Sequence, residues 1–153
     1  MSLMLLTAAA MLGVSGGAVA NPEPQEIIVR HRGAELQARY RAEVDVRTRQ
    51  IGSAPPTRVG SARCVWTATV AVHREVGEPG GPQVATLARK IDEKVLATGY
   101  RPGGCMETRK GIAADAGRHG PAAESHLRAV AQRDQHQLTA ELDQLHGLVA
   151  QRD

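Results

Sequence analysis

The sequence predicts an α+β domain in which C-terminal helices cover one face of an antiparallel sheet. Two long segments, 36–50 and 60–75, alternate apolar and polar side chains, which is typical of strands with one buried face. A connection rich in Gly and Pro joins them, so we expect an antiparallel pair. Apolar residues then recur at helical spacing over 106–116 and 121–150. A chain of 153 residues suits one domain of this class.

The N-terminus has the features of a cleavable secretory signal. It has no charged side chain before Asn21, and an apolar stretch from Leu3 to Val14 leads to Ala18-Val19-Ala20. This stretch is too short for a membrane span, which needs roughly 20 apolar residues. We expect cleavage before Asn21, a periplasmic or secreted protein, and no membrane span after cleavage.

The expected domain organisation follows from that leader. Residues 1–20 are the signal peptide, residues 21–25 are a disordered lead-in containing two prolines, and residues 26–153 form the single α+β domain. A short first strand is predicted around Ile27 to Val29, and Gly33 ends it.

The segment from Gln83 to Thr98 fits two structures. Val84, Leu87, Ile91 and Val95 have helical spacing, so local pattern favours a helix. The alternative is a further strand, because a two-stranded ribbon is marginally stable and gains from another strand at its edge. The local pattern makes helix the preferred interpretation.

Cys64 and Cys105 are the only cysteines, and both lie beyond the signal peptide. In an oxidising compartment such a pair persists as a disulfide, which would join the helix at 106–116 to the sheet. Trp66 shares a face with Cys64, so we expect it to be buried beside the disulfide. The alternative is a reactive Cys105 thiol at a helix N-terminus.

The final helix carries an apolar stripe interrupted by one acid, Asp134. Because an unpaired buried carboxylate is costly, we expect this acid either to form an ion pair with an arginine from the sheet or to lie at a solvent-exposed gap in the stripe. Its replacement should then affect stability or oligomerisation and not catalysis. The stripe consists of Leu127, Val130, Ala131, Leu138, Leu142, Leu145 and Val149.

Motifs for chemistry are weak. His126, His136 and His146 recur along the final helix but point in different directions around it, so no metal site is expected. A G-x-S-x-G string at 13–17 lies in the predicted leader, and His73-Arg74-Glu75 lacks the C-x-x-C that would complete a deaminase zinc site. We expect no cofactor and no catalytic residue.

Acidic and basic residues are interleaved, with a net charge of +3 and only three aromatic residues, which disfavours nucleic-acid binding. Arginines on the polar face of the first long strand could bind an envelope protein or an anionic envelope component. The alternative is a self-neutralising surface. These arginines are Arg39, Arg41, Arg47 and Arg49.

The preferred hypothesis is therefore an exported, non-catalytic binding or structural module that acts through this arginine face or the final helix. The competing hypothesis is a small periplasmic hydrolase or thiol-redox enzyme that uses Asp134, His126 or Cys105. At least two of these residues would then converge in one pocket. The sequence leaves the oligomeric state open.

Overall fold

The computed structural model describes residues 19–53, 60–84 and 87–150 and has the expected α+β architecture. Most of the predicted signal peptide, residues 1–18, lies outside the described residues. Four antiparallel strands form one sheet in the order β1-β2-β3-β4, and two helices follow. The elements are β1 (Gln25–His31), β2 (Ala34–Ile51), β3 (Arg63–Gly77), β4 (Arg89–Pro102), α1 (Cys105–Gly117) and α2 (Gly120–Ala150).

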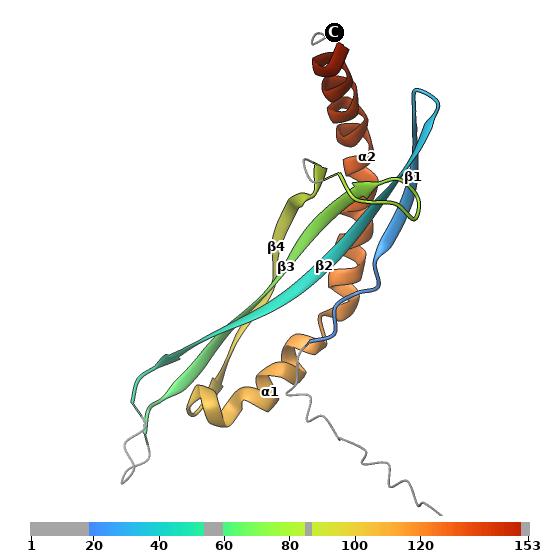
Figure 1. Ribbon diagram of the computed structural model, residues 1–153. Helices are drawn as coiled ribbons and strands as arrows, with labels where there is room; N and C mark the ends of the chain where they lie inside the picture. The colour runs from blue at the N-terminus through green and yellow to red at the C-terminus, as the bar shows by residue number, and fades with distance from the viewer. Residues whose placement is uncertain (1–18, 54–59, 85–86, 151–153) are drawn as a thin grey trace, which may run out of the picture.

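The sheet is long and twisted, and the two helices pack against different ends of it (Figure 1). Helix α2 runs behind the strands at the end near β1, and α1 crosses the opposite end, near the termini of β2 and β4. The two long strands that the sequence predicts are β2, with 18 residues, and β3, with 15. The prediction of a sheet covered by C-terminal helices is confirmed.

Strands β1 and β2 are joined by a two-residue turn in which both central residues have positive φ. Arg32 has φ 50° and Gly33 has φ 86°, while His31 pairs with Ala34 across the turn. This conformation suits the right-handed twist of a hairpin, and Gly adopts it without steric cost. Gly33 therefore allows the tight turn that joins β1 to β2.

Strand β2 is much longer than the partner on its outer side. Its pairing with β3 extends from Gln37 to Ile51, but its pairing with β1 ends where Gln25 meets Tyr40. Beyond Tyr40, the outer edge of β2 has no strand beside it within the described residues.

The prediction of a helix over the segment from Gln83 to Thr98 is wrong. Its larger part belongs to β4, which pairs with β3 as the outer strand of the sheet. Two register shifts interrupt that pairing, between Ala68 and Thr69 and between Val72 and His73. Such irregularities disturb the period-two alternation that identifies a strand, and pairing with β3 then decides the structure.

The buried residues form two clusters. The larger one lies between α2 and the sheet and includes Tyr40, Leu127 and Leu138. The smaller one lies between α1 and the sheet and includes Trp66 and Ile112. The stripe of α2 is buried from Leu127 to Leu142, including its one acid, Asp134, and Leu145 is half-buried. The side chain of Val149 is outside the described residues.

Trp66 is 6% exposed and packs across the sheet against Gly99 of β4, its pairing partner. A Cβ atom at Gly99 would lie 2.7 Å from ring atoms of Trp66. Only glycine leaves room for the indole at this position.

Candidate functional site: the open edge of strand β2

Cys64 and Cys105 form the predicted disulfide. Cys64 is fully buried on β3, and Cys105 is the first residue of α1. The bond therefore attaches the start of α1 to the sheet, next to Trp66 in the smaller cluster. With both sulfurs bonded to each other, neither is a free thiolate, the form that nucleophilic chemistry requires.

Asp134 lies in the larger cluster, where Arg74 of β3 pairs with it. Arg74 is 0% exposed, and its Nη1 donates a hydrogen bond to Asp134 Oδ2 at 2.8 Å. Its Nη2 donates to Glu141 Oε2 at 2.5 Å, and the Tyr40 hydroxyl donates to Asp134 Oδ2 at 3.0 Å. Arg89 contacts the second oxygen of Glu141 from the surface.

The pKa shifts in this buried network favour the charged form of Arg74 and the neutral form of Tyr40. Burial raises the pKa of Tyr40 above its ordinary value, and the charge and hydrogen bond of Asp134 raise it further. Burial lowers the pKa of Arg74, but its hydrogen bonds to Asp134 and Glu141 outweigh this and raise it overall. Arg74 therefore stays a cation and Tyr40 a neutral donor.

His126 lies apart from both the disulfide and Asp134, on the side of α2 that faces β4. Its Nε2 lies 3.4 Å from Asp92 Oδ2, and Arg133 Nη2 donates to the same oxygen at 3.2 Å. His136 and His146 are exposed further along the helix. Within the described part of the chain, no group of three or more His, Cys, Asp or Glu residues could hold a metal ion.

The structure thus separates Asp134, His126 and Cys105, which the enzyme hypothesis would bring together. Asp134 pairs with Arg74, and Cys105 is bonded to Cys64. The buried His126 Nε2 lies 3.4 Å from Asp92 Oδ2 without a hydrogen bond among the described residues. A cavity of about 290 Å³ beside α2 is lined by Asp134 and Asp92 but not by His126 or Cys105.

The arginine face is largely neutralised by neighbouring acids. Arg39 lies 3.7 Å from Glu26, Arg41 contacts Glu75, and Arg47 lies 2.8 Å from Asp45. For Arg49, no acidic partner is found within the described residues. The four side chains share one exposed face of β2, and three of their charges are already paired.

The outer edge of β2, beyond the end of β1, lies beside an apolar groove. The groove has a volume of about 450 Å³ and runs between β2 and α1. Met106, at the start of α1, is 83% exposed here. The groove is also lined by Val19 and Asn21 of the N-terminal segment, by Glu43, Val44, Val46 and Thr48 from β2, and by Cys105, Arg109, Ile112 and Ala113 from α1.

The edge also offers backbone hydrogen-bonding groups. The Val44 amide donates to Asn21 Oδ1 at 2.9 Å, so the Val44 N–H points away from β3. Because N–H and C=O groups alternate between the two edges of a strand, those of Val46 and Thr48 point to the same outer side. Among the described residues, the outward backbone groups of Val46 and Thr48 have no partner, and such edge groups favour pairing with another strand.

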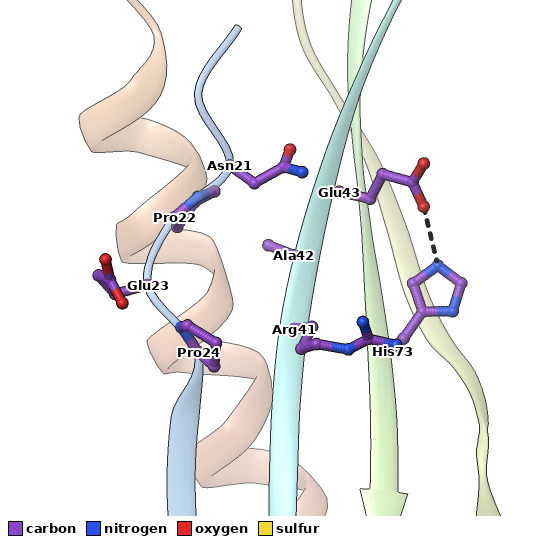
Figure 2. A pocket seen from close by; sticks show the side chains of 8 residues that line it. All are labelled: Asn21, Pro22, Glu23, Pro24, Arg41, Ala42, Glu43 and His73. Carbon is purple, nitrogen blue, oxygen red and sulfur yellow. Dashed lines mark ion pairs between the residues drawn. The ribbon is translucent and has the colours of Figure 1, made fainter. Parts of the chain in front are cut away.

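The N-terminal segment lies along the first part of this edge, from Asn21 beside Val44 to Val19, which packs on the smaller cluster together with Val46 (Figure 2). Extending the register of β1 and β2 by four residues from the pair Gln25–Tyr40 would place Asn21 opposite Val44. Figure 2 shows Asn21 pointing toward β2 and the segment lying alongside it. Strand β1 begins only at Gln25, and the Val44 amide bonds to the side chain of Asn21, so this segment does not continue the backbone ladder.

A third cavity, of about 600 Å³, lies between this N-terminal segment and the strands. It is lined by Arg41, Glu43 and His73, and His73 Nε2 lies 3.9 Å from Glu43 Oε2 across the sheet (Figure 2).

Sequence reasoning missed Arg74 and the β2 edge. Arg74 has the parity of Val70 and Val72, which face the core, so a basic residue at a buried position of an alternating strand was the available signal. The open edge had no sequence signal, because it depends on where β1 stops pairing.

Searches against known protein families, curated proteins and solved structures found no match for this chain. None of the helices in the described part of the chain has the length and apolar character needed to span a bilayer.

Proposed function

We propose that this chain is an exported, non-catalytic module that binds another polypeptide along the open edge of β2. The observation that carries the proposal is the outer half of β2, where outward-pointing backbone groups lie beside an apolar groove. An extended segment added at such an edge gains main-chain hydrogen bonds, and alternate side chains enter the neighbouring groove.

Export is supported by the disulfide, which persists in an oxidising compartment. The sequence of residues 1–20 supplies the proposed signal peptide. Both features suit a periplasmic or secreted module.

A binding role is favoured over catalysis by the contacts of the candidate catalytic groups. Asp134 is engaged by Arg74 and Tyr40, and Cys105 is bonded to Cys64. These contacts stabilise the fold and leave neither group free to act on a substrate.

The β2 edge is also a better candidate surface than the arginine face or the final helix. Most arginine charges are offset by Glu26, Glu75 and Asp45, so an anionic envelope component would compete with these internal pairs. The apolar stripe of α2 is buried against the sheet through Leu142.

A photo-crosslinking amino acid at Thr48 tests the proposal in cells that export the protein. We expect one recurrent adduct, identified by mass spectrometry, from Thr48 and none from the same probe at Ala129, an exposed position on α2. Val46→Pro should abolish that adduct. The Val46 N–H points outward, so the loss of this N–H removes a hydrogen bond to the partner and leaves the β2–β3 ladder intact. The proposal is wrong if the Thr48 probe captures nothing or if both probes capture the same proteins.

A further inference from the structure

We infer that the polypeptide bound at the β2 edge is a second copy of this chain, paired antiparallel about a two-fold axis at Val46. The inference rests on the proposed function and names its partner. Its basis is the charge order along the exposed face of β2, which reads Glu43, Asp45, Arg47 and Arg49.

This order is self-complementary when the strand meets its own copy in the antiparallel direction. With Val46 opposite Val46 of the second copy, Asp45 faces Arg47 and Glu43 faces Arg49. Symmetry repeats both pairs, so all four charged positions face an opposite charge. Opposite charges at directly paired positions stabilise a sheet, and like charges destabilise it.

Neighbouring registers lack this property. A shift of the pairing by two residues in either direction moves the two-fold axis to Asp45 or to Arg47. That residue then faces the same residue of the second copy, which carries the same charge. The pattern therefore selects one register as well as a partner. Glu43, Asp45 and Arg47 have exposed fractions of 72%, 57% and 85%, so Arg47 can exchange its present contact with Asp45 of its own chain for Asp45 of the second copy.

The backbone and the groove fit the same register. Val44 would pair with Thr48 of the second copy, and these residues have outward-pointing N–H and C=O groups. Their side chains and that of Val46 face the groove. Because the axis is perpendicular to the sheet, both α1 helices lie on one side of the joined sheets, where the exposed Met106 would gain apolar contacts.

The backbone of the second copy would replace the Asn21 side chain as the acceptor for the Val44 amide. One hydrogen bond is thus exchanged for a ladder of backbone hydrogen bonds between the two copies. The predicted cleavage before Asn21 would also remove Val19, which lines the groove. The mature chain is therefore the form expected to dimerise.

Cysteine trapping tests the register. In the proposed pair, the two Val46 Cα atoms are about 5.5 Å apart, which a disulfide can span. Oxidised Val46→Cys should form a covalent dimer of the mature protein, and Thr48→Cys should not, because Thr48 lies far from its own copy. Equal trapping by both variants, or by neither, would overturn the inference.

Charge exchange tests the complementarity. Sedimentation of the mature protein from about 1 µM to about 1 mM should show a monomer–dimer equilibrium. Asp45→Lys should weaken dimerisation by about tenfold or more, and Asp45→Lys/Arg47→Asp should restore it. Circular dichroism controls for folding, and failure of the double variant to recover argues against this register.

The outcomes separate this inference from the proposed function. A protein that stays monomeric while its Thr48 probe captures a different polypeptide retains the proposed function and loses the second copy as partner. A monomer whose probe captures nothing loses both.

Discussion

The two ends of the sheet are held to their helices by different chemistry. At the end covered by α2, the larger cluster surrounds the buried cation Arg74, its partner Asp134 and the Tyr40 hydroxyl. At the end covered by α1, the smaller cluster contains Trp66 and several small side chains, and a disulfide crosses it.

The difference shows how core size determines the means of stabilisation. Leu127 and Leu138 bury enough apolar surface at the α2 end to accommodate an ionic network, whose desolvation cost must be offset by good geometry. At the α1 end, Ala68 and Ala116 contribute little area, and the chain contains no Phe. There the disulfide restricts the unfolded chain and adds stability that packing alone does not supply.

The largest expected effect comes from removing the buried cation. Arg74→Met should destabilise the protein by about 3–5 kcal/mol, because it leaves the buried Asp134 carboxylate without its partner. Asp134→Asn should act in the same direction. Urea unfolding followed by circular dichroism measures the change. The matched control is Arg89→Met, a half-exposed partner of Glu141 whose loss should cost less than about 1 kcal/mol. Equal losses at Arg74 and Arg89 would contradict a buried network.

The disulfide should have the next largest effect. Replacing Cys64 and Cys105 by Ala removes a link across a sequence separation of 41 residues, and the chain-entropy relation gives a loss of up to about 4 kcal/mol. The fluorescence of Trp66 should shift to longer wavelength as α1 loosens. Wild-type protein with reductant is the control. Unchanged emission in the variant would show that the indole is held without the disulfide.

The smallest effect is a pH dependence at the α1 end. Arg101 Nε and Nη2 donate to Asp115 at 2.8 and 3.0 Å, and chiefly these hydrogen bonds lower the pKa of Asp115. The stabilising contribution is complete above the ordinary Asp pKa of about 4 and is lost as pH falls through the lowered value. Asp115→Asn should thus be less stable than wild type at neutral pH, with a difference that shrinks in acid.

Arg101→Met provides the matched test of that pair, because it removes the donor and keeps the carboxylate. Its stability deficit, measured by urea unfolding over the same pH series, should shrink in acid in the same way. A deficit independent of pH in both variants would show that packing, and not the ion pair, links β4 to α1.

The sequence by itself determined the parts whose burial is periodic and local. Alternation placed Tyr40 and Trp66 on the inner face, helical spacing placed Leu127 and Leu138 against the sheet, and two cysteines in the whole chain allowed one disulfide. The position of Asp134 within its helical stripe also led to two alternatives, an arginine partner from the sheet or an exposed gap, of which the structure has the first. These inferences succeed because side-chain direction repeats every two residues in a strand and every 3.6 in a helix.

Only the tertiary structure decided the remaining features. The segment 83–98 has helical spacing, but the hydrogen bonds offered by β3 make most of it strand β4, and register shifts hide its alternation. Arg74 became the partner of Asp134 because the sheet and α2 meet there, across 60 residues of sequence. The open edge of β2 exists because β1 stops pairing at Gln25 while β2 continues to Ile51. Each depends on contacts between distant segments, which local periodicity does not encode.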